Sequence, residues 1–237
     1  TAFMEWLCCA FVFWFCGAVF ASDALGLSWL QTQVRADGSL AHEGASAALP
    51  IQSRAEVATT LQGMAGTFPA ALLNAIDQTS GTSVEILARK ALAKQLTAPS
   101  TAYLDALAKQ LTAPSTAYLD ALAQQQNPDG GFGAQQGYAS NVLDTAWALA
   151  AFTNEVNAYG GAVGQAIAWL IGAQQSDGQW RLAPDGDALV PTALAVQALQ
   201  PYRQNVVVAA ALSKARAWLL AERDSALVWG SSLRNAH

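Results

Sequence analysis

One stretch of the sequence combines an acidic side chain with the start of an apolar helix. Asp144 lies in the first turn of a helix predicted from Val142 to about Asn154, with Ser140 as its expected cap. In a first turn, the helix dipole and the free amide groups favour the ionised carboxylate, which is the wrong state for a strong acid. We therefore interpret Asp144 as a helix-start residue and as only a weak candidate for a catalytic acid.

Residues for metal binding or nucleophilic catalysis are scarce. The chain has three cysteines, all before residue 22, and two histidines: Cys8, Cys9, Cys16, His42 and His237. A thiolate zinc site is therefore not available in the rest of the chain. No glycine-rich phosphate loop follows a strand, and no Ser/His/Asp set can be identified. We expect neither a metal nor a cofactor.

Polar residues also gather in two loops that precede Ala-rich helices. These loops are longer than a tight helix–helix connection needs, and such loops often carry function. The residues that we expect to form a binding surface there are Gln135, Gln136, Tyr138, Arg181, Asp185 and Asp187. A glycan-processing site would instead need carboxylates that converge on one rim, from Glu43, Asp144, Asp185 and Asp187 together with Tyr138. Carboxylate separation decides that chemistry, and the sequence does not give it.

Composition indicates an all-helical protein. Of the 237 residues, 53% are hydrophobic and 12% are charged, against about 25% charged residues in typical soluble domains. Alanine is abundant, and the sequence has no run of alternating β-branched residues of the kind that is typical of a strand. The net charge is −5 and no basic stripe is present, so we expect no nucleic-acid partner.

A helix that stops at a polar turn recurs along the chain. The segment Ala166 to Trp180 reads AIAWLIGAQQSDGQW, an apolar helix followed by an Asp-Gly turn. Trp169 and Trp218 are 49 residues apart, and Phe132 and Trp180 are 48 apart, which predicts a repeat architecture. The residues that recur in these units are Trp29, Asp37, Gly38, Gln126, Asp129, Gly130, Phe132, Trp169, Gln174, Gly178, Trp180, Trp218 and Trp229.

The order of residues in the repeated unit resembles the QW motif of squalene-hopene cyclases: an aromatic, a Leu, a Gln five residues after the aromatic, then Gly-x-Trp. We expect the Gln amide to bond the carbonyls at the end of its helix, with the Trp ring over it. Smaller Ala-rich helices follow the turns, at 144–152 and 191–199. This alternation resembles the terpenoid cyclase/protein prenyltransferase superfamily, and most closely its secreted bacterial proteins with prenyltransferase/squalene oxidase repeats. The resemblance implies an all-α fold, an α/α-toroid of repeated outer/inner helix pairs.

The resemblance also implies which side chains an enzyme of this kind would need. Class II cyclases of the superfamily protonate an alkene with an Asp of a DxDDTA motif that opens an inner helix. The matching stretch here is 141–146, NVLDTA, and Leu143 takes the place of the proton-bearing Asp. The zinc ligands of the prenyltransferases and the thioester Cys of other relatives are absent as well. Trp147, on the same helix, is expected to pack rather than to stabilise a carbocation.

Because those side chains are missing, we expect a non-catalytic toroid, secreted or attached to the cell surface, that presents a binding surface to an unidentified ligand or protein partner. Two alternatives stay open. The first is a squalene- or terpene-cyclase-like enzyme, and the second is a glycan-processing enzyme of the α/α type.

The chain ends and an internal duplication complete the expected organisation. Residues 1–21 are interpreted as a signal peptide, because the apolar run Trp6 to Phe20 is short for a membrane span and ends in Val-Phe-Ala. The mature domain then comprises residues 22–237, with no membrane span. We expect this toroid to be incomplete at its C-terminal end and part of a longer polypeptide. Within it, residues 91–105 are repeated identically at 106–120.

Export predicts a defined N-terminus. In secreted material, we expect mass spectrometry to find a chain that begins at Ser22 or close to it, because cleavage would follow Ala21. An intact chain starting at Met4 in the cytoplasmic fraction would contradict this expectation.

Overall fold

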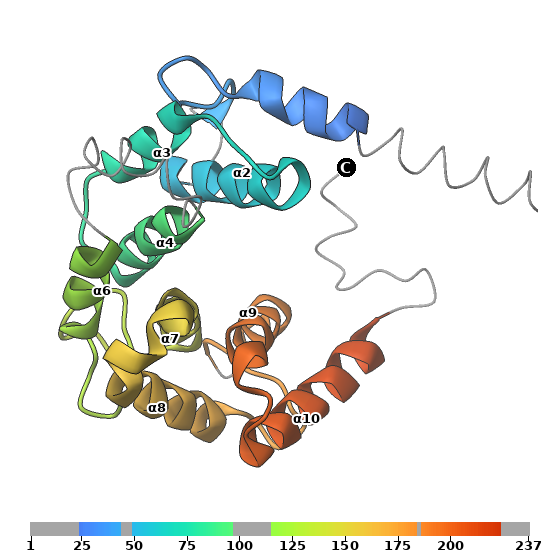
Figure 1. Ribbon diagram of the computed structural model, residues 1–237. Helices are drawn as coiled ribbons and strands as arrows, with labels where there is room; N and C mark the ends of the chain where they lie inside the picture. Colours follow the sequence, from blue (N-terminus) through green and yellow to red (C-terminus); the bar gives the residue numbers. More distant parts are fainter. Residues whose placement is uncertain (1–23, 44–48, 97–114, 184–185, 224–237) are drawn as a thin grey trace, which may run out of the picture. The chain divides into compact units, whose positions relative to one another are not determined.

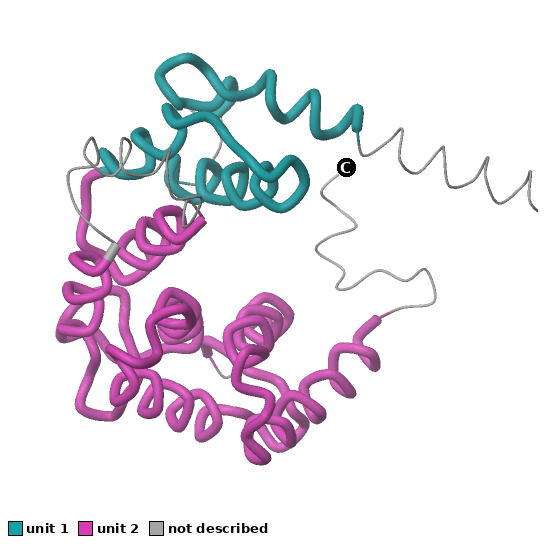
Figure 2. The backbone as a smooth tube through the Cα atoms, in the orientation of Figure 1, with its two compact units in different colours: residues 1–79 teal, residues 80–237 magenta. Residues whose placement is uncertain are grey.

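The computed structural model describes residues 24–43, 49–96, 115–183 and 186–223. The chain divides into two compact units, residues 1–79 and 80–237 (Figure 2). The regular structure in the described ranges is helical, apart from one isolated antiparallel bridge between Val34 and Leu40. Across the same ranges, none of the helices combines the length and the apolar composition that crossing a membrane requires. The extent of the domain, residues 22–237, stays a prediction.

The first unit contains a helix over residues 24–33, α2 (Pro50–Ala65) and α3 (Ala70–Asp77). Pro50 fits the first turn of α2 because that position needs no amide hydrogen, and Gly66 ends the helix at a φ of 68°. Pro69 is the N-cap of α3. The two helices pack against each other through buried apolar side chains: Ile51, Leu61, Leu72 and Ile76.

The described residues of the second unit form six α-helices and two short 3-10 turns. They are α4 (Val84–Gln95), α6 (Ser115–Ala123), α7 (Val142–Phe152), α8 (Val156–Ala173), α9 (Leu189–Leu199) and α10 (Val206–Glu222), with η2 (Thr153–Glu155) and η3 (Gln200–Tyr202). α7 packs between α4 and α9, while α6, α8 and α10 pack behind this layer (Figure 1). The predicted alternation of outer and inner helices is confirmed, and the fold is an all-α α/α-toroid.

Small side chains let α7 pack closely on its neighbouring helices. Its buried alanines, Ala146, Ala148 and Ala151, are at most 2% exposed, and α7 packs on α4, α8 and α9. A buried Ala keeps the two backbones close, and larger groups then fill the space at the helix ends. Phe152 does so at the C-terminal end of α7, where its ring lies 6.3 Å from that of Phe132.

The cap of α7 differs from the one that we predicted. Asn141, not Ser140, is the N-cap, and its side-chain oxygen accepts a hydrogen bond of 3.0 Å from the amide of Asp144. Ser140 instead donates its hydroxyl to the Asp129 carboxylate at 2.7 Å. An Asn cap is as favourable as a Ser cap, so sequence preference could not separate the two.

Three turns in the chain have the same backbone structure, at residues 35–40, 127–132 and 175–180. In each, an Asp side chain accepts a hydrogen bond from the amide two residues later, and the glycine between them has a positive φ. The Asp residues are Asp37, Asp129 and Asp177, and the glycines are Gly38 (81°), Gly130 (88°) and Gly178 (98°). The repeat inferred from the sequence is thus a repeat of structure, with one such turn after the helix at 24–33, after α6 and after α8.

Each turn glycine lies against the backbone of a neighbouring outer helix. A Cβ on Gly38, Gly130 or Gly178 would approach a carbonyl oxygen of that helix to 2.0, 2.9 or 2.6 Å. The facing residues are Ala71 in α3, Gln165 in α8 and Lys214 in α10. Each turn therefore requires glycine for two reasons: the positive φ and the close approach of the neighbouring backbone.

A glutamine amide joins two of these turns to the outer helix. Gln126 Nε2 donates to the carbonyls of Gly130 and Ala162, both at 2.9 Å, and Gln174 Nε2 does the same with Gly178 and Ala211. We predicted that the Gln would bond the end of its own helix. It bonds the next outer helix instead, and Trp180 Nε1 donates to a carbonyl of the preceding helix, that of Leu170, at 2.7 Å.

The duplicated segment can be shortened by one copy without changing the sequence of either flanking helix. The first copy supplies the last five residues of α4, Ala91 to Gln95, and the second copy repeats that sequence at 106–110. Deleting residues 91–105 therefore leaves the sequences of α4 and α6 unchanged. The connection between them shortens about fivefold, from residues 96–114 to residues 111–114. The entropic part of the free energy needed to close this connection therefore falls by about 1.4 kcal/mol.

We expect the deletion to keep the melting temperature level or to raise it by about 2–4 °C, as measured by thermal unfolding followed with circular dichroism. α4 and α6 already pack against each other, and a four-residue connection is ordinary for neighbouring helices. A fall of many degrees would show that the fold depends on the residues by which the deletion shortens the connection between α4 and α6.

Candidate functional site

Charged and aromatic side chains meet where α4 packs on α7. We call Glu85, Arg89, Asp144 and Trp147 the α4–α7 cluster. Arg89 Nε donates to Glu85 Oε1 at 2.9 Å, and the Arg89 side chain is only 8% exposed. Its guanidinium carbon lies 4.0 Å from the centre of the Trp147 ring. This cation–π contact occupies one face of the indole, in agreement with the packing role predicted for Trp147.

Asp144 is half-buried in the first turn of α7. Asn141 Nδ2 donates to its Oδ2 at 2.5 Å, and its own amide donates back to Asn141 Oδ1. Burial raises the pKa of the Asp144 carboxyl above its ordinary value, and the negative charge of Glu85 raises it further, while the Asn141 hydrogen bond lowers it. The net shift is upward, so the carboxyl keeps its proton to a higher pH than an exposed aspartic acid does.

The direction of this pKa shift is opposite to the one that a position in the first turn of a helix favours. The sequence placed Asp144 at a helix start and therefore predicted an ionised group. In the structure, loss of water around the carboxyl outweighs the local dipole, and Glu85 comes close from a different helix. Neither burial nor the approach of α4 could be read from the residues around position 144.

The loop before α7 holds three of the predicted binding residues. Gln135, Gln136 and Tyr138 are exposed, and 62% of Tyr138 is accessible to solvent. A backbone hydrogen bond of 3.0 Å from Tyr138 to Gln135 closes the loop, and the Tyr138 carbonyl accepts from the Asn127 side chain at 2.8 Å. The backbone of this loop is thus fixed while its side chains remain available to a ligand.

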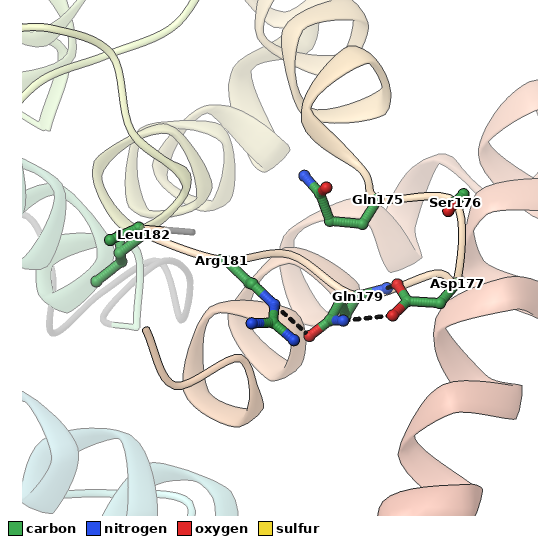
Figure 3. Close-up of a pocket in the computed structure, with 7 residues that line it drawn as sticks. Gln175, Ser176, Asp177, Gln179, Arg181 and Leu182 are labelled. Atoms are coloured by element: carbon green, nitrogen blue, oxygen red, sulfur yellow. Dashed lines mark hydrogen bonds between the residues drawn. The ribbon is translucent and has the colours of Figure 1, made fainter. Parts of the chain in front are cut away.

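The other predicted binding residues lie near the turn that precedes α9. A pocket of about 510 Å³ there is lined by Gln175, Ser176, Asp177, Gln179, Arg181, Leu182 and Ala183 (Figure 3). Arg181 Nε donates to Gln179 Oε1 at 2.8 Å, and Gln179 Nε2 donates to Asp177 Oδ2. Asp187 lines an adjoining pocket with Arg181, whereas Asp185 lies outside the described residues. Sequence reasoning missed Asp177 and Gln179, which looked like turn residues only.

Glu43 lies in the first unit, where it forms an ion pair with Arg54. Arg54 binds both of its carboxylate oxygens, at 2.5 and 2.9 Å, and the amide of Leu40 donates to Oε2 at 3.1 Å. The Arg54 hydrogen bonds hold the pKa of Glu43 below its ordinary value despite partial burial. A paired carboxylate with a lowered pKa is suited to fixing the 35–40 turn, not to donating a proton.

The tryptophans of the repeated unit differ in their surroundings. Trp180 is fully buried, Trp169 is partly buried and donates its Nε1 to Asp129 Oδ2 at 3.1 Å, and Trp29 is 61% exposed. Trp218 is partly buried and lines the pocket that contains Asp187. Trp229 lies outside the described residues. The same residue type therefore serves as core, as a hydrogen-bond donor and as a pocket wall.

Comparison with known proteins identifies the fold. No protein-family model matches the chain, and no curated protein matches it. The structure is similar to that of ent-copalyl diphosphate synthase from Streptomyces platensis, with a TM-score of 0.65 and 23% sequence identity. The match covers 84% of this chain and 39% of that protein. The chain therefore has a terpenoid cyclase-like α/α-toroid fold, and it spans well under half the length of that structure.

This likeness contradicts the expectation of a non-catalytic toroid. One solved structure that shares the fold, ent-copalyl diphosphate synthase, is a terpene cyclase, so the comparison favours the cyclase-like alternative over a protein that only presents a binding surface. The expectation was based on the missing central Asp of the DxDDTA-like stretch. It gave too little weight to Asp144, whose carboxyl the fold partly removes from water.

Proposed function

We propose that the chain is the toroid part of a terpene-cyclase-like enzyme that starts cyclisation by protonating an isoprenoid alkene. The observation that carries the proposal is the half-buried Asp144 carboxyl at the start of an inner helix, with its pKa raised by burial and by Glu85. The likeness to ent-copalyl diphosphate synthase supports it. From that name we infer the substrate class, a linear polyprenyl chain with or without a diphosphate group.

The proposed reaction begins with proton transfer from the Asp144 carboxyl to the terminal alkene. The proton forms a new C–H bond at the less substituted carbon, and the tertiary carbon becomes a cation that an internal double bond attacks. Loss of a proton to water ends the sequence, and Asp144 regains its proton from solvent. An alkene is a weak base, so the acid must stay protonated in its resting state, which the raised pKa favours.

The departure from the motif of the superfamily has a direct consequence. Leu143 stands where the proton-bearing Asp is expected, so the acid in this proposal is displaced by one position along the helix. Consecutive helical residues point in directions about 100° apart. The proposed acid therefore lies on a different side of α7 from the one that the motif of the superfamily predicts, and Glu85 of α4 acts on its pKa there.

The proposal extends to location. We propose an exported bacterial protein whose turns are repeats of the squalene-cyclase QW type. The apolar run from Trp6 to Phe20 supports export, although it lies outside the described residues. The Gln126 and Gln174 amides support the repeat type because the same side chain makes the same two bonds in both turns.

Substitution of the acid tests the proposal. We expect the full chain to convert squalene or geranylgeranyl diphosphate to a cyclic product, detected by gas chromatography with mass spectrometry. Asp144→Asn should lower the rate by about 100-fold or more, the usual contribution of a general acid. The rate of the unchanged protein should be highest at low pH and should fall as the pH rises through the raised pKa of Asp144, because only the protonated form reacts.

A matched control separates chemistry from folding. Glu155→Gln makes the same change from carboxylate to amide on η2, outside the α4–α7 cluster, and should leave the rate unchanged. Asp144→Asn should fold normally because a neutral amide is easier to bury than a carboxylate. Lack of turnover with both substrates, or a folded Asp144→Asn variant with full activity, would contradict the proposal.

A further inference from the structure

The second and third turns share a backbone but differ in how they are covered. In the second turn, Asp129 accepts from the amide of Gly131 at 3.0 Å, from the Ser140 hydroxyl at 2.7 Å and from Trp169 Nε1 at 3.1 Å. These contacts close the turn. They depend on Gly131, because a Cβ there would lie 2.5 Å from Ser140 and 2.8 Å from Trp169.

The third turn cannot form the same contacts, because two of its residues differ in type from those of the second turn. Gln179 stands where the second turn has Gly131, one residue after the turn glycine, and its amide occupies Asp177 Oδ2, the oxygen corresponding to the one that Trp169 bonds in the second turn. Asp187 stands where the second turn has Ser140, directly before the N-cap of the inner helix. A carboxylate cannot donate to Asp177 as the Ser140 hydroxyl donates to Asp129.

Trp218 is the counterpart of Trp169. Each lies four residues after the carbonyl that the turn glycine faces, that of Lys214 or of Gln165. Within the described part of the chain, the indole N–H of Trp218 has no hydrogen-bond partner. A pocket of about 380 Å³ occupies this region, and we call it the third-turn pocket: Asp177, Gln179, Arg181, Gly186, Asp187, Ala188, Leu189, Trp218 and Glu222.

We propose that the third-turn pocket binds a saccharide. Its wall combines an indole ring, which can stack on the C–H face of a sugar, with carboxylates that accept from hydroxyl groups. The indole N–H of Trp218 can donate to an acceptor on a ligand. A hydroxyl can donate to Asp187 and accept from Trp218, whereas an ammonium group only donates. The three carboxylates repel a diphosphate, so this pocket is separate from the isoprenoid chemistry proposed above.

The site lies at the surface and within the size range of small-ligand pockets, about 300–1,000 Å³. It adjoins the pocket of Figure 3, and both contain the hydrogen-bonded row of Asp177, Gln179 and Arg181. That row is held in place before a ligand arrives, because Gln179 is only 5% exposed and bonds both neighbours. A preorganised wall reduces the entropy lost on binding.

Binding can be measured on the full chain by isothermal titration calorimetry with four neutral oligosaccharides: cellohexaose, maltohexaose, xylohexaose and chitohexaose. We expect at least one to bind and to change the tryptophan fluorescence, because Trp218 lies in the wall. Trp218→Ala should weaken binding by about tenfold or more, in line with the loss of one stacking contact and one hydrogen bond.

A second variant tests the pocket without removing an aromatic residue. The double substitution Gln179→Gly and Asp187→Ser rebuilds the second-turn arrangement, so Trp218 should bond Asp177 and close the pocket. We expect binding to be lost while the melting temperature stays level or rises. Glu155→Gln, on η2, is the control that should bind normally.

Three results would overturn the proposal. They are no binding of any of the four oligosaccharides, unchanged binding in the double variant, and binding of spermidine but of no saccharide, which would make the pocket a site for organic cations. The proposal is independent of cyclisation, because loss of turnover in Asp144→Asn should leave saccharide binding intact.

Discussion

The contact between each turn glycine and the neighbouring outer helix is the constraint on which the rest of the fold depends. At Gly178 the backbone comes so close to Lys214 that no side chain fits between them, and the positive φ independently requires glycine. The Gln174 amide then bonds a carbonyl on each side of the contact. If α10 moved away, the Ala211 carbonyl would lose this partner, and an unsatisfied buried carbonyl costs about 1–3 kcal/mol.

The same turns fix where the inner helices begin. The amide of Phe132 donates to Thr145 Oγ1 at 2.9 Å, and the amide of Trp180 donates to Thr192 Oγ1 at the same distance. Both threonines are fully buried in the first turns of α7 and α9. Through the first of these bonds, the turn sets the position of Asp144, the residue before Thr145, and so sets its approach to Glu85. The proposed chemistry is therefore a consequence of how the repeats join.

Much of this architecture could be predicted from the sequence, because it depends on local signals. The Pro50 and Gly66 boundaries of α2 and the recurring Asp-Gly turns follow from residue type and spacing. Contacts between repeats could not be predicted. The partner of Gln174 is Ala211, 37 residues later, and the group that raises the pKa of Asp144 lies on α4. The α4–α7 cluster and the third-turn pocket both arise from such contacts. The sequence therefore predicted the fold and its outer/inner helix pairs, but not these two sites.

The measurement that tests this account most directly is the stability of Gly178→Ala against Gly164→Ala, by urea denaturation. Gly164 lies within α8 with open space around its Cβ position, so its substitution should stabilise by about 0.5–1 kcal/mol. Gly178→Ala should instead cost about 2 kcal/mol or more, because the new methyl group meets the α10 backbone and the φ of 98° is strained. A Gly178→Ala variant as stable as the unchanged protein would contradict the claim that this contact joins the repeats.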